Sequence, residues 1–199
     1  MCIRDRSTTI SQLVDAAGKL SKNRRGALIV VDLGSDLRPE DFLYSGTTIE
    51  AQLSTDLLIN LFATDTPLHD GAVLVKGNKI ISAGVILPLS RQGISRYGTR
   101  HLAALGITER FDRCICIVVS EETGTLSLAN QGKLERPITS SRLQELLVNL
   151  IGNQNSTGTS KSSLSKNALS QKTNPSDNII SDINEKDTEK SEIFINKKD

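Results

Sequence analysis

Aromatic side chains are scarce in this sequence, which contains no tryptophan. Only 3% of its 199 residues are aromatic, so a stacking platform of the kind that binds single-stranded nucleic acid would be thin. The formal net charge is +1, and such a balanced chain has no overall field that attracts nucleic acid or an anionic membrane surface. We therefore expect no nucleic-acid partner and a core built from aliphatic side chains.

Cysteines and long apolar runs are also few. The three cysteines, Cys2, Cys114 and Cys116, form no CxxC pair. The last two alternate with isoleucines in a strand-like segment, which indicates small buried side chains and fits a reducing, cytoplasmic compartment. No stretch of eighteen apolar residues is present, so nothing in this sequence is expected to span a bilayer. The P-loop, dinucleotide-binding, HExxH and GxSxG signatures are absent too.

The two ends differ in composition from the middle. The first six residues, MCIRDR, lack the apolar segment of a signal peptide, and their codons can be read from a common transposase adapter. We expect residues 1–7 to be a non-native leader, with a natural short leader as the alternative; a non-native leader would mean that the true N-terminus and any membrane segment are missing. Residues 152–199 are rich in Ser, Asn, Lys and acids, which predicts a disordered polar tail.

Residues 8–151 are predicted to form one domain of mixed secondary structure. The spacing of apolar residues predicts helices over 8–20, 54–62, 96–109 and 139–151. Apolar runs predict strands over 26–32 and 113–120, and paired strands over 71–87 and 124–138, with turns at Gly77-Asn78 and Gln131-Gly132. Because strands and helices do not alternate regularly, we expect an α/β (α+β) fold with a mixed central β-sheet flanked by helices.

Three short polar segments stand at the edges of apolar elements, and the first precedes a predicted buried strand. His69 and Asp70 are not packing residues at such a position, and the chain has only two histidines. Gly71 and Ala72 are small enough to let a ligand approach the backbone. This segment therefore offers a metal ligand or a base at the start of a strand.

The other two segments favour phosphate and a hard cation. Thr99 and Arg100 stand at a predicted helix entrance, where free N–H groups and the helix dipole favour an anion, and a guanidinium suits phosphate. Thr99 could either cap the helix or bind a phosphate oxygen. Glu121 and Glu122 end the cysteine-containing strand, where two carboxylates suit Mg²⁺ or Mn²⁺. Together the three segments supply what phosphoryl or nucleotidyl transfer needs.

Each segment also has an ordinary structural interpretation. An Asp-Gly pair is most often a turn, Arg-His at a helix start is usually a solvated face with a partly buried ring, and Ser-Glu-Glu after a strand is often a capping loop. The residues by themselves therefore do not identify a reaction.

Four motifs, in this order and at these intervals, resemble the diadenylate cyclase (DAC) domain family: LHDGA, LPLS, GTRHLAALG and VSEETG. The resemblance covers roughly residues 8–151 and is closest to the membrane-associated bacterial subgroup, in which transmembrane helices and a linker helix precede the catalytic domain. It implies a cytoplasmic domain of a protein that is anchored to the cell membrane through an N-terminal segment missing here.

The resemblance implies a reaction in which two ATP molecules form cyclic di-AMP and two pyrophosphates. Each domain would bind one ATP and face a second domain, so a homodimer or higher homo-oligomer is needed, together with a divalent metal, Mn²⁺ or Mg²⁺. The implied catalytic residues are Asp70, Gly71, Ala72, Arg100 and His101; the ATP-binding residues are Leu87, Gly98, Thr99, Arg100, Ser120 and Glu121; and the metal ligands are Asp70, His69 and Glu122.

Two positions depart from the family pattern. Leu102 stands where relatives have a second arginine, and Ile86 stands where many have an aromatic residue that can stack on adenine. These departures keep a second hypothesis open, a catalytically weak nucleotide-binding or sensor module of the same fold. Because Leu102 begins the apolar run LAALGI, we expect it to be packed among its neighbours.

Overall fold

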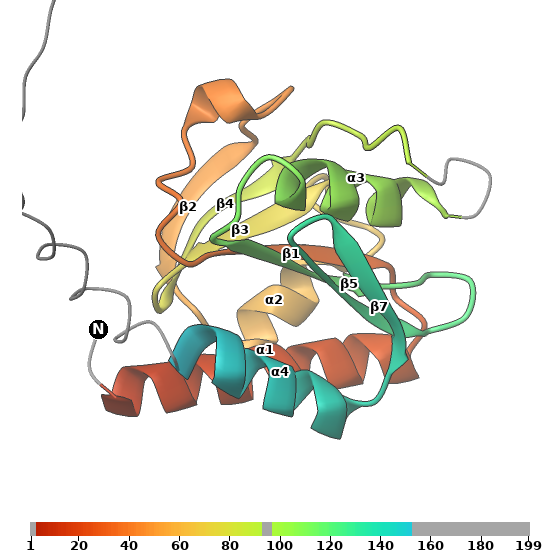
Figure 1. Cartoon of the computed structure of the whole chain (residues 1–199). Coiled ribbons are helices and arrows are strands. Elements are labelled where there is room, and N and C mark those ends of the chain that lie inside the picture. The colour runs from red at the N-terminus through yellow and green to blue at the C-terminus, as the bar shows by residue number, and fades with distance from the viewer. Residues whose placement is uncertain (1–2, 93–96, 153–199) are drawn as a thin grey trace, which may run out of the picture. The chain divides into compact units, whose positions relative to one another are not determined.

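A seven-stranded sheet forms the centre of the fold. The computed structural model describes residues 3–92 and 97–152, and the strand order in this part of the chain is β2-β4-β3-β1-β5-β6-β7 (Figure 1). The strands are β1 (Ala27–Asp32), β2 (Thr47–Gln52), β3 (Ala72–Lys76), β4 (Lys79–Val85), β5 (Cys114–Val119), β6 (Leu126–Asn130) and β7 (Lys133–Ile138). The helices are α1 (Ile3–Lys22), α2 (Thr55–Leu61), α3 (Thr99–Thr108) and α4 (Ser140–Gly152), with a short 3₁₀ turn, η1 (Pro39–Asp41). The expected α+β fold with a mixed sheet is confirmed.

One parallel pair makes the sheet mixed. β1 and β3 are parallel, with Ile29 beside Val73, whereas the remaining neighbours in the sheet are antiparallel. The chain between β1 and β3 passes through η1, β2 and α2. As a consequence, the N-terminal ends of β1 and β3 and the C-terminal ends of β4 and β5 lie at the same edge of the sheet.

Two apolar clusters cover the two faces of the sheet. Along β1, Ile29 and Val31 belong to the cluster beneath α1, α2 and α4, while Leu28 and Val30 belong to the cluster beneath α3, because successive side chains of a strand point to opposite faces. Figure 1 shows α3 on one face and the other three helices on the opposite face. The long apolar run of β1 is thus explained by burial on both sides.

Most of the predicted elements are confirmed, and side chains cap two of the helices. Ser54 accepts a hydrogen bond from the Leu57 N–H at 3.2 Å and caps α2, and Thr139 accepts one from the Arg142 N–H at 3.1 Å before α4. Both predicted turns contain a glycine in the left-handed region, Gly77 at φ +63° and Gly132 at φ +68°. These side-chain and backbone preferences are local, so the sequence reveals them directly.

Two elements differ from the prediction. α1 begins at Ile3, not at residue 8, so part of the expected leader is helical; its first turns are polar and carry no apolar period that could reveal them. β2 was not predicted. It is an edge strand whose side chains are mostly exposed, so burial imposes no apolar pattern on it. No described helix is long and apolar enough to cross a membrane. Of the predicted tail, Gly152 is the last residue of α4, and the rest lies outside the described residues.

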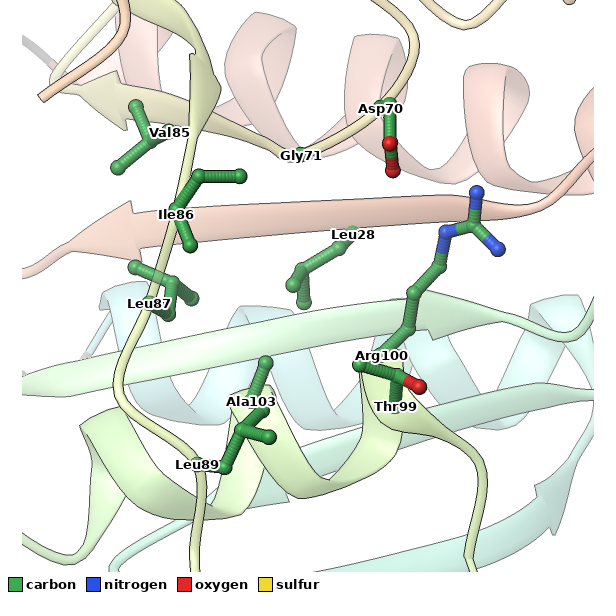
Figure 2. Close-up of a pocket in the computed structure, with 10 residues that line it drawn as sticks. All are labelled: Leu28, Asp70, Gly71, Val85, Ile86, Leu87, Leu89, Thr99, Arg100 and Ala103. Atoms are coloured by element: carbon green, nitrogen blue, oxygen red, sulfur yellow. The ribbon is translucent and has the colours of Figure 1, made fainter. Parts of the chain in front are cut away.

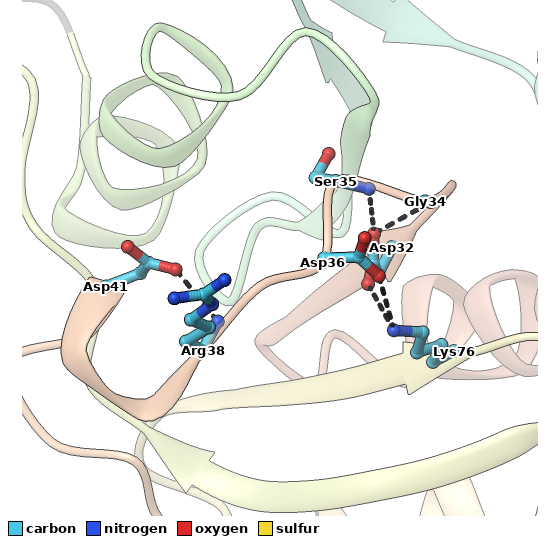
Figure 3. Close-up of polar contacts among 7 residues, drawn as sticks. All are labelled: Asp32, Gly34, Ser35, Asp36, Arg38, Asp41 and Lys76. Carbon is cyan, nitrogen blue, oxygen red and sulfur yellow. Dashed lines mark hydrogen bonds and ion pairs between the residues drawn. The ribbon is translucent and has the colours of Figure 1, made fainter.

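At the sheet edge opposite the N-terminal ends of β1 and β3, a buried carboxylate binds the backbone of the following turn and a lysine. Asp32, at the end of β1, accepts hydrogen bonds from the N–H groups of Gly34 (2.8 Å) and Ser35 (2.7 Å). Its other oxygen lies 3.5 Å from the Lys76 ammonium, which also lies 3.2 Å from Asp36 (Figure 3). The side chain of Asp32 is 2% exposed, so these partners satisfy an otherwise unfavourable buried charge.

Leu102 is buried, as expected, with 7% of its surface exposed. We predict that Leu102→Arg lowers the free energy of unfolding by about 2 kcal/mol, because the guanidinium must either be buried without a partner or distort α3 to reach water. Urea unfolding checks this. The control, Leu102→Met, conserves volume and should cost less than about 1.5 kcal/mol. Equal stability of the arginine variant and the wild type would contradict the packing of Leu102.

Candidate active site

The segments that carry the motifs meet at one edge of the sheet. Asp70 and Gly71 precede β3, Leu87 follows β4, Ser120 follows β5, and Gly26 precedes β1. These strand ends share an edge because β1 and β3 are parallel and both β4 and β5 are antiparallel to a neighbour in that pair. The N-terminus of α3 lies at the same edge, since Thr99 and Arg100 line cavities together with Asp70, Leu87 and Ser120.

An apolar cavity of about 260 Å³ lies between the end of β4, strand β1 and helix α3 (Figure 2). Figure 2 shows Ile86 and Leu87 along one side and the Asp70 carboxylate and Arg100 guanidinium toward the other. Among the described residues, the N–H and C=O of Leu87 make no backbone hydrogen bond outside the regular elements, so this wall offers a donor and an acceptor. The lining residues are Leu28, Asp70, Gly71, Val85, Ile86, Leu87, Leu89, Thr99, Arg100 and Ala103.

A polar cavity of about 530 Å³ adjoins the apolar one. It lies between the N-terminus of α3, the loop after β5 and strand β7, and it shares Thr99 and Arg100 with the apolar cavity. One ligand could therefore place an apolar part in the first cavity and a charged part in the second. Its lining residues are Gly98, Thr99, Arg100, His101, Val119, Ser120, Glu121, Glu122, Thr123 and Arg136.

The N-terminus of α3 is open to a ligand at the junction of the two cavities. Gly98 is the N-cap and provides no side-chain cap; its carbonyl accepts hydrogen bonds from the N–H groups of His101 (3.0 Å) and Leu102 (3.1 Å). Thr99 is the first helical residue, so it does not cap the helix. Among the described residues its hydroxyl has no hydrogen-bond partner, and it stands where the helix dipole favours an anion.

An ion pair holds Arg100 across the junction. Its Nη1 lies 2.9 Å from Oε2 of Glu121. A Cβ at Gly26 would lie 2.8 Å from the same Nη1 and 3.0 Å from the Glu121 Cβ, so the absence of a side chain at Gly26 leaves the space in which this pair lies. The pair is partly exposed, with 29% and 59% of the two side chains accessible, and contributes little to stability. Its effect is to orient the guanidinium.

Hydrogen bonds within its own backbone hold the loop after β5 in a tight turn. The Ser120 N–H donates to the Thr125 carbonyl at 3.0 Å, and the Gly124 N–H donates to the Ser120 carbonyl at 2.8 Å. At Gly124 (φ +72°), a Cβ would lie 2.6 Å from the Ser21 carbonyl oxygen of α1, which requires glycine there. Glu121 and Glu122 are thereby held at the polar cavity by a tight, anchored turn.

His101, in the first turn of α3, is buried and contacts Ser127 and Tyr97. It is 7% exposed, its Nε2 lies 3.1 Å from the Ser127 hydroxyl, and its ring stacks on Tyr97 with centroids 6.3 Å apart. Burial lowers the pKa of His101 below its ordinary value of 6.5, and the positive charge of Arg136 lowers the pKa further. The imidazole is therefore favoured in its neutral form.

The expected metal ligands are not assembled as a preformed cluster. Asp70 lines the apolar cavity and Glu122 the polar one, and the described residues contain no group of three His, Cys, Asp or Glu side chains placed to hold a metal. His69 is oriented by its Nδ1, which contacts the Thr66 carbonyl. Because a carbonyl only accepts, Nδ1 carries a hydrogen, and Nε2 is the ring nitrogen that a metal could approach. Carboxylate oxygens such as those of Asp70 and Glu122 are ligands of the kind that Mg²⁺ and Mn²⁺ prefer, and a bound ion would take its other ligands from phosphate oxygens and water.

Gly71 and Ala72, the two small residues of the first motif, have different surroundings. Gly71 lines the apolar cavity, but its φ is +137° and a Cβ would lie 2.7 Å from the Gly84 backbone, so the neighbouring strand already requires glycine. Ala72 is fully buried and lines neither cavity. Its side chain belongs to the apolar cluster beneath α3, which also contains Leu28, Leu87 and Ala103 of the cavity wall, and the expectation that a ligand approaches its backbone stays a prediction.

Several lining residues were missed by the sequence analysis. Leu28, Leu89 and Ala103 belong to apolar runs and carry no chemical signal of their own. Arg136 lies on an edge strand, 36 positions after Arg100. Only the alternation along β1, which places Leu28 on the α3 face, could have indicated one of them.

Together the two cavities and the helix N-terminus between them define a nucleotide-binding domain. The chain belongs to the family described as "DAC: DisA bacterial checkpoint controller nucleotide-binding", whose model matches residues 14–134. It is 44% identical over 147 residues to a diadenylate cyclase of Listeria monocytogenes, an alignment that covers 73% of this chain and 53% of the relative.

Two solved structures share this fold. A double cysteine mutant of DacA from Staphylococcus aureus is 37% identical, with a TM-score of 0.68 and coverage of 74% of this chain and 98% of that chain. A "hypothetical membrane spanning protein" from Bacillus cereus is 44% identical, with a TM-score of 0.60 and coverage of 65% and 63%. The chain spans about half the length of the first curated relatives it matches.

The lowered pKa of His101 predicts acid sensitivity of the fold. Above pH 6.5 the imidazole is neutral in both states; below it, the unfolded chain takes up a proton that the folded state resists, so stability falls with pH until the folded pKa is reached. We expect the melting temperature of the wild type to fall more steeply between pH 7 and pH 5 than that of His101→Gln, which can still hydrogen-bond Ser127. Identical slopes would contradict this assignment.

Proposed function

We propose that this domain is a diadenylate cyclase, which condenses two ATP molecules into cyclic di-AMP with release of two pyrophosphates. The observation that carries the proposal is the junction of an apolar and a polar cavity at the N-terminus of α3. Membership of the DAC family and a relative named diadenylate cyclase support the reaction.

The apolar cavity suits the adenine base. Leu28, Leu87 and Ala103 supply apolar surface for the faces of the ring. The free N–H and C=O of Leu87 can pair with a base edge that carries both an acceptor nitrogen and an amino group, as adenine does. The base would then be selected by backbone groups whose positions are fixed by the end of β4.

The phosphates would run from the junction into the polar cavity. Thr99 and Arg100 stand at the shared wall, where the helix N-terminus favours negative charge. Gly98 leaves this approach open, since a Cβ there would meet no atom within 4 Å. Ser120 and Glu121 line the far wall, where the Ser120 hydroxyl can donate to a phosphate oxygen, while His101 keeps the start of α3 in place through Ser127.

Asp70 is the group placed to activate the attacking hydroxyl. Its carboxylate stands at the polar end of the apolar cavity, where it can accept the proton of a ribose 3′-hydroxyl. The oxygen then forms a bond to the α-phosphorus of the second ATP, and the bond from that phosphorus to the β-bridging oxygen breaks with its electron pair leaving on pyrophosphate. A divalent metal held by Asp70, His69 and Glu122 with phosphate oxygens would neutralise charge on the phosphates.

Two facing copies are needed for the ring to close. The described part of one chain holds one pair of joined cavities and so accommodates one ATP, whereas the product contains two nucleotides. The second ATP would be presented by another copy, in a homodimer or higher homo-oligomer. We further propose that the full-length protein is anchored to the cell membrane with this domain in the cytoplasm, a proposal that the similarity to a "hypothetical membrane spanning protein" supports.

The first test removes the carboxylate of Asp70. With ATP and Mn²⁺, the wild type should form cyclic di-AMP, and Asp70→Asn should form it about 10²–10⁴-fold more slowly while still binding ATP, because proton acceptance needs the charge. Asp36→Asn, at the opposite sheet edge, is the matched control and should keep full activity. Nucleotide binding without any product from the wild type would instead favour the weak nucleotide-binding module.

A second test concerns assembly. Since each turnover needs two domains, specific activity of the isolated domain should rise with protein concentration from nanomolar to high micromolar, because no membrane segment raises the local concentration. Product formation and sedimentation velocity measured on the same samples check this. Constant specific activity from a species that stays monomeric throughout would exclude the facing-domain arrangement.

A further inference from the structure

The polar cavity contains a second guanidinium that the family motifs do not include. Arg136 lies on β7, the last strand of the sheet, and lines the same cavity as Arg100, Ser120 and Glu122. Two residues earlier, Leu134 packs against the apolar cluster beneath α3. Arg136 lines the cavity at the N-terminus of α3, whereas the preceding residue, Glu135, pairs with Arg142 of α4 at 2.9 Å.

The side chain of Arg136 is held by an aromatic ring. Its Cζ lies 5.6 Å from the centroid of Tyr97, and Tyr97 stacks on His101 of α3. A guanidinium over a ring is stabilised by cation–π attraction while its N–H donors, which lie in the plane of the group, remain free. The lowered pKa of His101 supports this placement, since the charge of Arg136 contributes to it. The stack thus fixes a cation without consuming its hydrogen bonds.

The two arginines of the polar cavity differ in their charge balance. Arg100 is neutralised by Glu121 at 2.9 Å. In the part of the chain that the structure describes, Arg136 has no ion pair with a carboxylate, and it is exposed to solvent. An accessible, fixed and unpaired guanidinium beside a helix N-terminus is a binding group for phosphate oxygens.

We infer that Arg136 binds the β- and γ-phosphates of ATP, and therefore the pyrophosphate that leaves; this inference rests on the proposed function. The assignment to the β- and γ-phosphates follows from which residues line which cavity. Thr99 and Arg100 belong to both cavities, so they lie where the α-phosphate joins the nucleoside, whereas Arg136 lines only the polar cavity. When the bond between the α-phosphorus and the bridging oxygen breaks, negative charge develops on that oxygen, and Arg136 stabilises the departing group.

Nucleotides with different numbers of phosphates test the inference. In titration calorimetry, Arg136→Gln should weaken ATP and ADP binding about ten- to a hundred-fold, as expected for loss of a charged hydrogen bond, and leave AMP binding unchanged. Arg136→Lys, which keeps the charge, should recover part of the loss. Lys133→Gln removes a charge from the far end of the same strand and is the matched control, expected to bind all three nucleotides as the wild type does.

The outcomes separate this inference from the proposed function. If the wild type makes cyclic di-AMP and Arg136→Gln binds ATP normally, the inference is wrong and the function stands. If Arg136→Gln weakens AMP as much as ATP and lowers the melting temperature, Arg136 only supports Tyr97 and His101, and the inference is again wrong. If the wild type binds AMP, ADP and ATP but makes no cyclic di-AMP with Mn²⁺, the proposed function fails, while the phosphate dependence still decides the role of Arg136.

Discussion

The parallel pairing of β1 with β3 is the constraint on which the site depends. It brings Gly26 and Asp70 to one edge of the sheet, and the antiparallel neighbours β4 and β5 return Leu87 and Ser120 to that edge. An antiparallel β1–β3 pair would place the Asp70 carboxylate at the edge where Asp32 and Lys76 now close the sheet (Figure 3). The long crossover that a parallel pair requires is here filled by β2 and α2, which cover other parts of the sheet and leave this edge open.

Charge is divided between two guanidiniums with different surroundings. Arg100 packs over Gly26 and pairs with Glu121, so in the free domain its charge is balanced and its position is set. Arg136 gains its position from a ring instead of a carboxylate. In such a site the Arg136 guanidinium remains available to bind a polyanion. Because Arg100 is paired, the site also avoids two adjacent unpaired positive charges, whose repulsion would destabilise the start of α3.

The sequence predicted the elements whose signals are local. Ser54 and Gly77 act within a few residues of their own positions, and the site residues Asp70, Arg100 and Glu121 stand in contiguous motifs whose resemblance to a family supplied their roles. Features that depend on the pairing register of strands far apart in the sequence could not be predicted. Arg136 reaches the polar cavity only through the pairing of β7 with β6. β2 lacks a pattern because an edge strand buries little.

The two departures from the family pattern affect the site differently. Leu102 lines neither cavity and its side chain is buried, so this departure contributes apolar packing around α3. Ile86 does line the apolar cavity, and it pairs with Tyr44 across an antiparallel bridge. Tyr44 itself is not among the residues that line this cavity. Of the two departures, only Ile86 alters a surface that a base would contact, and it keeps that surface apolar.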